Sequence, residues 1–337
     1  MYKIKIKIFI KKNLLLFFFT TFLFTNNIKA QENFSNFDEW VEFYKNYAID
    51  NGVSKQTVDV IFKNVIFLDQ VIKYDRKQPE FFEDTATYVS KRATKSRAKK
   101  AKKLLQENLS LFNEIEKKFK VEKEILLALW GIETNFGRHV GKMDIFSSLA
   151  TLSYDKRRRN FFSSQLLTLL KLVDQKLIDP NSYKGSWAGA YGNFQFMPST
   201  IANYAIDYDN NKKIDLKNSL EDSLASAANY INKIGWKKGQ PCFTQVRLNN
   251  KIKTDLINLS AKKISNKLKI SKWKKKGVTN YDGTVLENNL YAGLIMPDGK
   301  DGSPTFLVYD NYEKILKWNR SLRFGVSVCT LSEMIKI

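Results

Sequence analysis

Apolar residues recur at helical spacing from Phe37 to about Gly235, and this pattern limits the fold more than any other feature of the chain. In the first segment these residues are Phe37, Trp40, Val41, Tyr44 and Ala48. Residues spaced in this way lie on one face of an α-helix. Ser35 or Asn36 suits the N-cap of this helix, and Gly52 suits its end. We therefore predict a mainly α protein.

The pattern changes after Pro241. Two short β-rich runs, Leu290–Met296 and Thr305–Tyr309, are separated by turns that contain glycine and proline, which predicts a hairpin with a long loop. A final helix is predicted from about Leu322 to Ile337. The predicted fold class is therefore mainly α in an α+β arrangement, with a small β-containing insertion near the C-terminus.

The first thirty residues have the composition of a secretory signal peptide. Lysines up to Lys12 precede an apolar and threonine run from Leu14 to Phe24, and Ala30 suits a cleavage site before Gln31. The run is shorter than the roughly 20 residues that a membrane span needs. An uncleaved anchor is the alternative. Because no cysteine lies near the cleavage point, we expect no lipid anchor and a periplasmic location.

The chain carries a formal net charge of +22, and six of its lysines lie in the first thirty residues. Such an excess would serve phosphate contacts in a nucleic-acid-binding protein, or steering toward a polymer that bears carboxylates. A compositional bias toward lysine and asparagine would need neither. Export argues against nucleic acid and leaves the other two explanations open. The dense basic stretch Lys91–Lys103 is predicted to be a solvated helix face.

Several kinds of chemistry are excluded by what the sequence lacks. His139 is the only histidine, which excludes a histidine-rich zinc site. No nucleotide-binding glycine pattern is present. Cys242 and Cys329 are the only cysteines, and the sequence leaves a disulfide and a buried free thiol both open. Carboxylates are the remaining candidates for catalysis.

Glu133 is a candidate general acid. The segment Glu122–Phe136 has helical periodicity, and Glu133 continues its apolar face four positions after Leu129. A carboxyl group at the end of a buried stripe loses solvation, which favours its protonated form and suits a general acid. The alternative is a half-buried structural glutamate paired with Arg138 or Lys142, and spacing alone does not separate the two.

A second unusual segment, Gly185–Thr200, mixes small and aromatic residues. Its aromatic residues are Trp187, Tyr191, Phe194 and Phe196. Small residues allow close backbone approach and aromatic faces stack on sugar rings, so the mixture favours a glycan groove. Gln195 is placed to orient a substrate amide or hydroxyl. The alternative, a packing turn between helices, explains the glycines but not this many aromatic residues.

Five ordered segments carry a resemblance to a known family. They are WGIETNFG, SSLATLSYDKRRRNFFSSQL, GSWAGAYGNFQFMPST, AANYINKIGW and FLVYDNYEKILKWNRS. Together with DRKQPEF, from Asp75 to Phe81, they resemble the signature segments of the membrane-bound lytic murein transglycosylase B family. The resemblance covers the chain from about Phe34 to Ile337. Five segments in order are far more specific than a single glutamate.

The resemblance implies a lysozyme-like helical catalytic domain that cleaves peptidoglycan between N-acetylmuramic acid and N-acetylglucosamine. Glu133 falls on the family's catalytic position. The implied mechanism has Glu133 protonate the glycosidic oxygen as general acid and then, as a carboxylate, take the proton of the muramoyl 6-hydroxyl, which closes a 1,6-anhydro ring. This chemistry requires no cofactor. A lysozyme-like hydrolase and a non-catalytic peptidoglycan-binding or scaffold protein are the alternatives.

The resemblance also suggests a division of the chain. The expected parts are a signal peptide at 1–30, an N-terminal helical region at 31–120, a lysozyme-like catalytic core at 121–240, a small α/β insertion at 241–310 and a C-terminal segment at 311–337 that completes the cleft. The expected partners are glycan strands, stem peptides and proteins of cell-wall synthesis, with no nucleic acid and no stable membrane span after processing.

Seven further positions match residues that bind substrate in the family. Those at sugar-binding positions are Ser186, Gln195, Tyr230, Trp318 and Asn319. Arg157 and Arg158 fall where basic residues meet the stem peptide, and guanidinium groups suit peptide carboxylates. Trp318 stands where tyrosine is common, and an indole can stack but cannot accept a hydrogen bond. Tyr191, Asn193 and Phe194 also depart from the usual glycine-loop pattern, and Phe194 stands where a glycine is typical.

An acidic loop resembles an EF-hand loop, which some family members use for calcium. Its residues at loop positions 1, 3, 5, 7 and 9 are Asp207, Asp209, Asn211, Lys213 and Asp215. Oxygen ligands at that spacing suit calcium, with Lys213 contributing its backbone carbonyl. However, Lys212 replaces the turn glycine, and Asn218 replaces the acid at position 12. A structural calcium ion and a surface loop capped by its own aspartates therefore both remain open.

Overall fold

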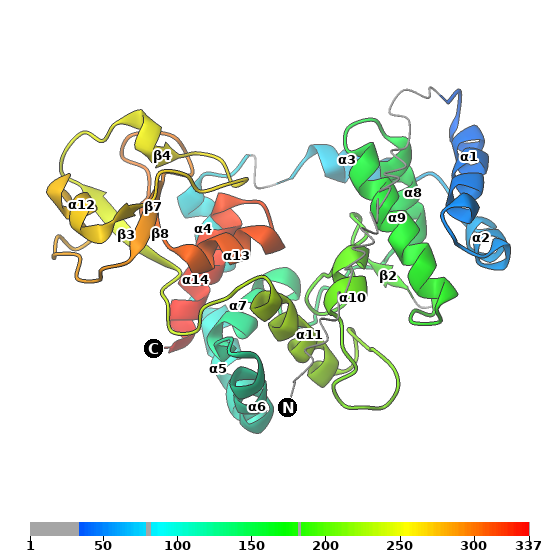
Figure 1. The fold of residues 1–337 in the computed structure, drawn as a ribbon, viewed down its shortest axis with the longest axis horizontal. Helices are drawn as coiled ribbons and strands as arrows, with labels where there is room; N and C mark the ends of the chain where they lie inside the picture. The colour runs from blue at the N-terminus through cyan, green and yellow to red at the C-terminus, as the bar shows by residue number, and fades with distance from the viewer. Residues whose placement is uncertain (1–33, 79–81, 181–182, 337) are drawn as a thin grey trace, which may run out of the picture. The chain divides into compact units, whose positions relative to one another are not determined.

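Helices make up most of the chain up to Lys233, as predicted, in the computed structural model, which describes residues 34–78, 82–180 and 183–336 (Figure 1). The first six helices are α1 (Phe37–Asp50), α2 (Lys55–Phe62), α3 (Asp69–Arg76), α4 (Thr85–Arg92), α5 (Lys95–Glu107) and α6 (Leu109–Phe119). Asn36 caps α1 by accepting the backbone N–H of Glu39 at 2.9 Å, which confirms one of the two predicted caps. The predicted signal peptide at 1–30 lies outside the described residues.

Five more helices and a two-stranded ribbon follow. They are α7 (Lys123–Thr134), β1 (Met143–Asp144), α8 (Ile145–Tyr154), α9 (Arg159–Asp174), β2 (Lys184–Gly185), α10 (Pro198–Tyr204) and α11 (Leu220–Lys233). β1 and β2 pair antiparallel, with Met143 opposite Gly185. This pairing connects the turn after α7 to the glycine-rich segment, so the two segments that the sequence singles out are held together.

A small sheet lies in the C-terminal part of the chain. Its elements are β3 (Phe243–Leu248), a short 3-10 helix (Thr254–Leu256), β4 (Ile257–Asn258), β5 (Leu268–Lys269), α12 (Ile270–Lys275), β6 (Val278–Asn280), β7 (Tyr291–Ile295) and β8 (Thr305–Val308). The strand order is β4-β7-β8-β3-β6, and β5 also pairs with β7. β7 and β8 form an antiparallel hairpin with Gly293 opposite Val308, which confirms the predicted hairpin. Trp273 of α12 is fully buried in the core of this sheet.

Two helices end the described chain, α13 (Asp310–Trp318) and α14 (Leu322–Lys336). α14 confirms the predicted final helix. Cys242, just before β3, forms a disulfide with Cys329 of α14, a pairing that the sequence does not decide. The bridge spans 87 positions of the chain and ties the sheet to the helical region. A crosslink of this kind contributes about 2–4 kcal/mol to the free energy of unfolding.

The core of the helical region is built around α7, which packs against α5, α6, α11 and α14 (Figure 1). Every residue of α7 from Ile125 to Gly131 is buried, and each fully buried leucine contributes about 1.5–3 kcal/mol. At Gly131 a Cβ would come within 2.8 Å of the Phe136 ring, so this close contact requires glycine. Dense packing on all sides therefore fixes the C-terminal turn of α7, which carries Glu133.

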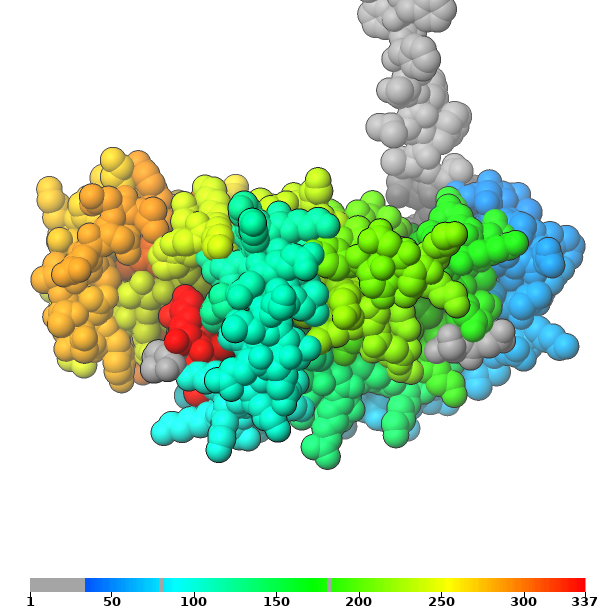
Figure 2. Space-filling view, turned by 90° about the horizontal axis from the view of Figure 1, so that it is seen from below, coloured from blue at the N-terminus to red at the C-terminus, as the bar shows by residue number. Residues whose placement is uncertain are grey.

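The basic stretch Lys91–Lys103 covers the end of α4 and most of α5. Ala98 and Ala101 face the core, whereas Lys99 and Lys103 are exposed. Figure 2 shows this segment in cyan at the surface beside α14, in red. The prediction of a solvated helix face is confirmed. In the described part of the chain, no helix has both the length and the hydropathy to cross a bilayer.

Candidate active site

α7 ends at Thr134, two residues earlier than the sequence predicts. Asn135 has a left-handed backbone with a φ of +51°, and the next two residues are also left-handed. Thr134 stabilises this turn, because its hydroxyl accepts the N–H of Gly137 at 3.0 Å and donates to the carbonyl of Asn193 at 2.7 Å. Glu133 therefore lies in the last helical turn, half-buried, where the chain turns sharply away.

Trp318, the last residue of α13, contacts Glu133 directly. Its indole Nε1–H donates to Glu133 Oε1 at 3.0 Å, across 185 positions of the sequence. An indole can only donate, so this contact favours the form of the carboxyl group in which Oε1 carries no proton. Trp318 therefore orients the Glu133 side chain by donating a hydrogen bond to it.

Aromatic rings pack around Trp318. Its ring centroid lies 5.2 Å from that of Tyr230, 5.5 Å from that of Phe196 and 6.1 Å from that of Phe194. Phe194 and Phe196 are 0% and 3% exposed, so they cannot stack on a sugar ring. For these two residues the predicted glycan groove is wrong. Their apolar surface gains more by joining the core around Trp130, 6.4 Å from Phe194, than by facing solvent.

Asn193 is buried, and its side-chain amide bonds to several segments of the chain. In the sequence it is recognisable only as a departure from the usual glycine-loop pattern. Its Oδ1 accepts the indole N–H of Trp130 at 3.1 Å, and its Nδ2 donates to the carbonyl of Lys217 at 2.9 Å and to Ser223 Oγ at 3.1 Å. A Cβ at Gly137 would lie 2.6 Å from Asn193 Oδ1. Asn193 thus joins α7 to the segment after the acidic loop. No local pattern signals this role, because every side-chain partner is remote in sequence.

Ser186 and Gln195 lie on the glycine-rich segment, and both are partly engaged by backbone. Ser186 Oγ accepts the N–H of Ala190 at 3.0 Å, a bond that does not use the hydroxyl proton. Gln195 Nε2 donates to the carbonyls of Val140 and Gly192, at 3.1 and 2.9 Å. Because both bonds use Nε2, Gln195 Oε1 remains as the atom that can accept a hydrogen bond from a substrate amide or hydroxyl.

Tyr230 and Asn319 flank Trp318 from α11 and from the end of α13. Tyr230 donates its hydroxyl to the carbonyl of Lys317 at 3.1 Å. Burial, with a smaller contribution from Tyr204, raises the pKa of Tyr230, so the phenol stays protonated at neutral pH. Asn319 follows α13 as its C-cap residue, in extended conformation. The structure therefore brings Tyr230 and Asn319 to Trp318, the residue that contacts Glu133.

Arg157 and Arg158 lie in the turn between α8 and α9, and both bind Asp75 at the end of α3. Arg157 donates from Nε to Asp75 Oδ2 at 2.7 Å. The sequence does not predict this contact, although Asp75 opens the DRKQPEF segment. Both arginine side chains remain 38% exposed, so each can also reach a ligand.

Three carboxylates of the acidic loop and its neighbour α11 converge. Oxygens of Asp207, Asp209 and Asp222 lie within 4.8 Å of one another. Asp215, in the predicted set, lies outside this group, and its carboxylate accepts the backbone N–H of Asn218 at 2.8 Å. Asp222 is fully buried, and burial raises its pKa. The predicted spacing extends to position 12 and so misses Asp222, the acid that folding supplies.

The remaining members of the predicted set, Asn211 and Lys213, shape the loop through their backbones. The N–H of Asn211 donates to Asp209 Oδ1 at 3.0 Å, and the N–H of Lys213 donates to Asn211 Oδ1 at 2.9 Å. Lys212, where a turn glycine is expected, has a φ of +69°. A left-handed residue other than glycine costs on the order of 1 kcal/mol, so the loop keeps its turn at some cost in stability.

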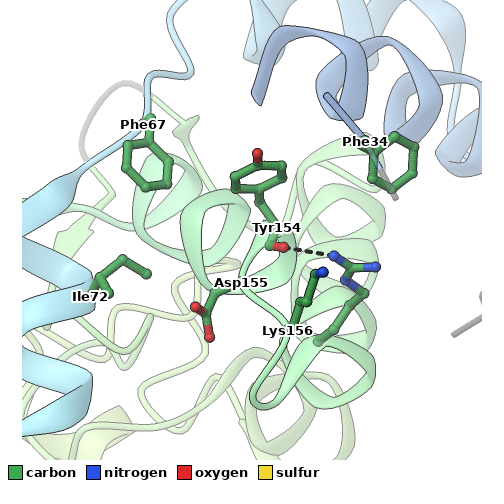
Figure 3. A pocket seen from close by; sticks show the side chains of 7 residues that line it. Phe34, Phe67, Ile72, Tyr154, Asp155 and Lys156 are labelled. Carbon is green, nitrogen blue, oxygen red and sulfur yellow. Dashed lines mark hydrogen bonds between the residues drawn. The ribbon is translucent and has the colours of Figure 1, made fainter. Parts of the chain in front are cut away.

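A separate cavity of about 240 Å³ lies between α3 and the turn from α8 to α9 (Figure 3). Its lining residues are Phe34, Phe67, Ile72, Tyr154, Asp155, Lys156 and Arg159. Neither Glu133 nor any predicted sugar-binding residue lines this cavity. It is therefore distinct from the site around Trp318.

Comparison with known proteins reveals a family and close structural neighbours. The model of the transglycosylase SLT domain family matches residues 36–333. Membrane-bound lytic murein transglycosylase B of Escherichia coli (strain K12) is 32% identical over 223 residues, which is 64% of this chain. The chain spans about 58% of the length of that protein.

Two solved structures illustrate the likeness. SltB3 from Pseudomonas aeruginosa, in complex with NAG-anhNAM-pentapeptide, has a TM-score of 0.80 and 33% identity, over 90% of this chain and 80% of that one. The lytic transglycosylase Slt35 of Escherichia coli, in complex with calcium, has a TM-score of 0.74 and 26% identity, over 88% and 92% of the two chains. These neighbours confirm the mainly α fold with a lysozyme-like catalytic domain.

Proposed function

Because this chain belongs to the transglycosylase SLT domain family, we propose that it is a lytic transglycosylase that cleaves the glycan strands of peptidoglycan. The observation that carries the proposal is the placement of Glu133. A single half-buried carboxyl group, oriented by the Trp318 indole, lies on the segment that resembles the family's catalytic motif. The SltB3 complex with NAG-anhNAM-pentapeptide supports the substrate class.

The proposed reaction uses Glu133 twice. The protonated carboxyl group gives its proton to the glycosidic oxygen, and the bond between this oxygen and C1 of the muramoyl sugar breaks. The resulting carboxylate then takes the proton of the muramoyl 6-hydroxyl, and O6 bonds to C1 to close the 1,6-anhydro ring. Glu133 regains its proton, so one carboxyl group suffices where most glycosidases use two. The N-acetyl group of the substrate helps to stabilise the positive charge that develops at C1.

The chemistry of the predicted sugar-binding residues suits that role. Trp318 offers a ring face and an indole N–H, and Tyr230 is a phenol that stays protonated. Ser186 retains a hydroxyl proton to donate, and Gln195 retains a carbonyl oxygen to accept. Asn319 adds a side-chain amide. We assign these five residues to the sugar subsites, and Arg157 and Arg158 to the carboxylates of the stem peptide.

The product distinguishes the proposal from its closest rival. A lytic transglycosylase leaves 1,6-anhydromuramoyl ends, whereas a hydrolase that admits water leaves reducing ends. Mass spectrometry of purified peptidoglycan after digestion measures both. We expect anhydro ends from the wild-type protein and release at least about a hundredfold slower from Glu133→Gln, which still binds the strands. Reducing ends alone would favour a hydrolase, and binding without any cleavage by the wild type would favour a scaffold.

We also propose that the acidic loop binds a structural calcium ion through Asp207, Asp209 and Asp222. Three hard carboxylate oxygens in close proximity match the ligands that calcium prefers. The Slt35 complex with calcium supports the assignment. Calcium chloride should raise the melting temperature relative to EDTA, and Asp209→Asn should reduce this difference, because a ligand of the folded state alone stabilises it. An equal melting temperature in calcium and EDTA would contradict the site.

The proposed location is the periplasm, as the composition of residues 1–30 suggests. Cell fractionation together with N-terminal sequencing tests this proposal. We expect the mature chain in the periplasmic fraction with an N-terminus near Gln31. Recovery of the intact first thirty residues on a cytoplasmic protein would contradict it.

A further inference from the structure

Asp75 is a buried carboxylate surrounded by arginines. It lies at the end of α3 and is 2% exposed. Arg157 donates to it from Nε, at 2.7 Å, and from Nη2, and Arg158 donates from Nη2 to Asp75 Oδ1. Arg76 adds a contact from Nη1 at 2.5 Å. Three cations thus converge on one carboxylate.

These contacts keep Asp75 ionised. Burial by itself would raise the pKa of Asp75, but the hydrogen bonds from Arg157 and Arg158 outweigh burial and lower it. A carboxyl group held in this way cannot act as a general acid near neutral pH. Its function must therefore lie in what it does to the arginines.

Asp75 fixes the two arginines in one orientation. The bonds to Asp75 use Nε and Nη2 of Arg157, and Arg157 Nη2 also donates to the Asp75 backbone carbonyl at 2.8 Å. These bonds do not use Nη1 of Arg157 or Nη1 of Arg158. Three guanidinium groups against the carboxylates of Asp75 and Asp155 leave a net positive charge, and the Arg157 and Arg158 side chains are 38% exposed.

The arginine pair is connected to the glycine-rich segment. Tyr74, next to Asp75 on α3, lies 6.4 Å from the ring of Trp187, which follows Ser186. Figure 3 shows Asp155 of the α8–α9 turn on the side that faces Ile72 of α3. Asp155 strengthens this arrangement, because it accepts from Arg76 at 2.8 Å and from the backbone N–H of Arg157 at 3.0 Å.

We propose that Asp75 is a positioning residue for stem-peptide recognition, holding Arg157 and Arg158 ready to bind a peptide carboxylate beside the glycan strand. This inference rests on the proposed function, in which the two arginines meet the stem peptide. Two long side chains that are ordered before binding lose less conformational entropy when the ligand arrives. Asp75 therefore affects the affinity for strands that carry peptides and leaves the chemistry at Glu133 unchanged.

The test compares Asp75→Asn with the wild type on two substrates. One is a glycan strand with its stem peptides, and the other is the same strand after an amidase has removed them. We expect Asp75→Asn to raise KM for the peptide-bearing strand about tenfold, with kcat and the KM for the bare strand unchanged. An equal KM for the peptide-bearing strand, or an equal rise for both strands, would overturn the inference.

Asp298→Asn is the matched control. Asp298 is also a largely buried carboxylate that accepts from an arginine, Arg323 at 2.8 Å, and it binds Thr85 as well. It lies in the loop between β7 and β8, away from the arginine pair in sequence. We expect both Asp298→Asn and Asp75→Asn to lower the melting temperature. Only Asp75→Asn should change the ratio of the KM for the peptide-bearing strand to the KM for the bare strand. The same change of ratio in both variants would assign the Asp75 effect to stability and overturn the inference.

A second variant covers the case in which Asp75→Asn does not fold. Arg158→Lys keeps the charge but loses the planar group that contacts Asp75. We expect a KM rise of a few fold for the peptide-bearing strand alone, and an unchanged KM would overturn the inference. Failure of the proposed function has a different signature, because the wild type would then release no anhydro ends from either strand.

Discussion

The two ends of α7 hold a glutamate in similar ways but in opposite electrostatic settings. Glu122, the N-cap residue, accepts the indole N–H of Trp236 at 2.6 Å and the backbone N–H of Gly239 at 2.6 Å. Glu133, in the last turn, accepts the indole N–H of Trp318 at 3.0 Å. The helix dipole stabilises negative charge at the first end and opposes it at the second. An indole partner alone therefore does not identify a catalytic acid.

The surroundings separate the two ends further. Near Glu122, the carboxylate of Glu116 pairs with Lys123 at 2.8 Å and with Lys238 at 2.7 Å, so charges hold this end together. At the other end, Trp318, whose indole contacts Glu133, packs against the ring of Tyr230. Ion pairs therefore support the first end of α7, and aromatic packing supports the indole at the second.

The largest expected effect tests the comparison directly. Glu133→Gln should lower kcat by a factor of about 100 to 10,000, because it removes the only proton donor in the proposed mechanism. Glu122→Gln should keep kcat within about twofold, but it removes the negative charge that accepts hydrogen bonds from Trp236 and Gly239, and bonds to a charged group are worth about 1.5–3 kcal/mol. Release of anhydro ends and the melting temperature measure the two effects. Equal losses of kcat in both variants would remove the distinction between the two ends.

Asn193→Ala removes side-chain contacts that hold the C-terminal end of α7, where Glu133 lies. It leaves the Trp130 indole N–H and the Lys217 carbonyl without their amide partner and opens a cavity, at a cost of about 2–4 kcal/mol. Because Asn193 contacts the turn after Glu133, kcat should fall as well. Asn258→Ala is the matched control, since Asn258 is a buried amide in β4 that bonds to the Leu294 carbonyl at 3.0 Å. A similar fall in kcat in the control would show that the effect is not local.

The two tryptophans sharpen the comparison. Trp318→Phe removes a donor from Glu133 and should lower kcat about tenfold, equivalent to about 1.4 kcal/mol, with a small change in melting temperature. Trp236→Phe removes the matching donor from Glu122 at a position that is 7% exposed. That variant should lose stability and keep its kcat. Steady-state kinetics and thermal unfolding check both, and the reverse pattern would contradict the assignment of roles.

The smallest effect is a pH dependence at the N-terminal end. Burial opposes ionisation of Glu116, but the bonds from Lys123 and Lys238 outweigh it and hold its pKa below the ordinary value of 4.5. A lowered pKa in the folded state means stability that is present above about pH 4.5 and is lost as the pH falls through the folded-state value. At pH 7 the free energy of unfolding of Glu116→Gln should be lower than that of the wild type by on the order of 1 kcal/mol, which thermal unfolding measures. A difference that persists undiminished at pH 3 would refute the ion-pair explanation.

Local features of the sequence predict much of the fold. The helix after Asn36, the β7–β8 hairpin and the final helix follow from spacing, capping and turn residues, which act over a few positions. The periodic pattern predicts that α7 ends two residues later than it does. The bonds of Thr134 to Gly137 and Asn193 decide where the helix stops. Boundaries set by remote partners are not visible in a periodic pattern.

The candidate site was predictable in part. Glu133 was singled out by its position on an apolar face and by the ordered segments around it. The prediction that Phe194 and Phe196 line a glycan groove is wrong, because both rings are buried and aromatic composition does not reveal which rings join the core. Asp222 escaped notice, because the acidic pattern stops before α11 begins and only the folded loop brings this carboxylate to the others.

By itself, the sequence determined the helical class of this protein, because that class depends on residue types at short spacing. It also indicated the candidate acid, through the five ordered segments that resemble a known family. Tertiary structure decided what surrounds that acid. Trp318 reaches Glu133 across 185 positions, and Arg157 reaches Asp75 across 82. Contacts at such separations arise only when whole elements pack, since neither partner contains a local signal for the other. The sequence thus indicates the candidate proton donor, and the fold orients its side chain.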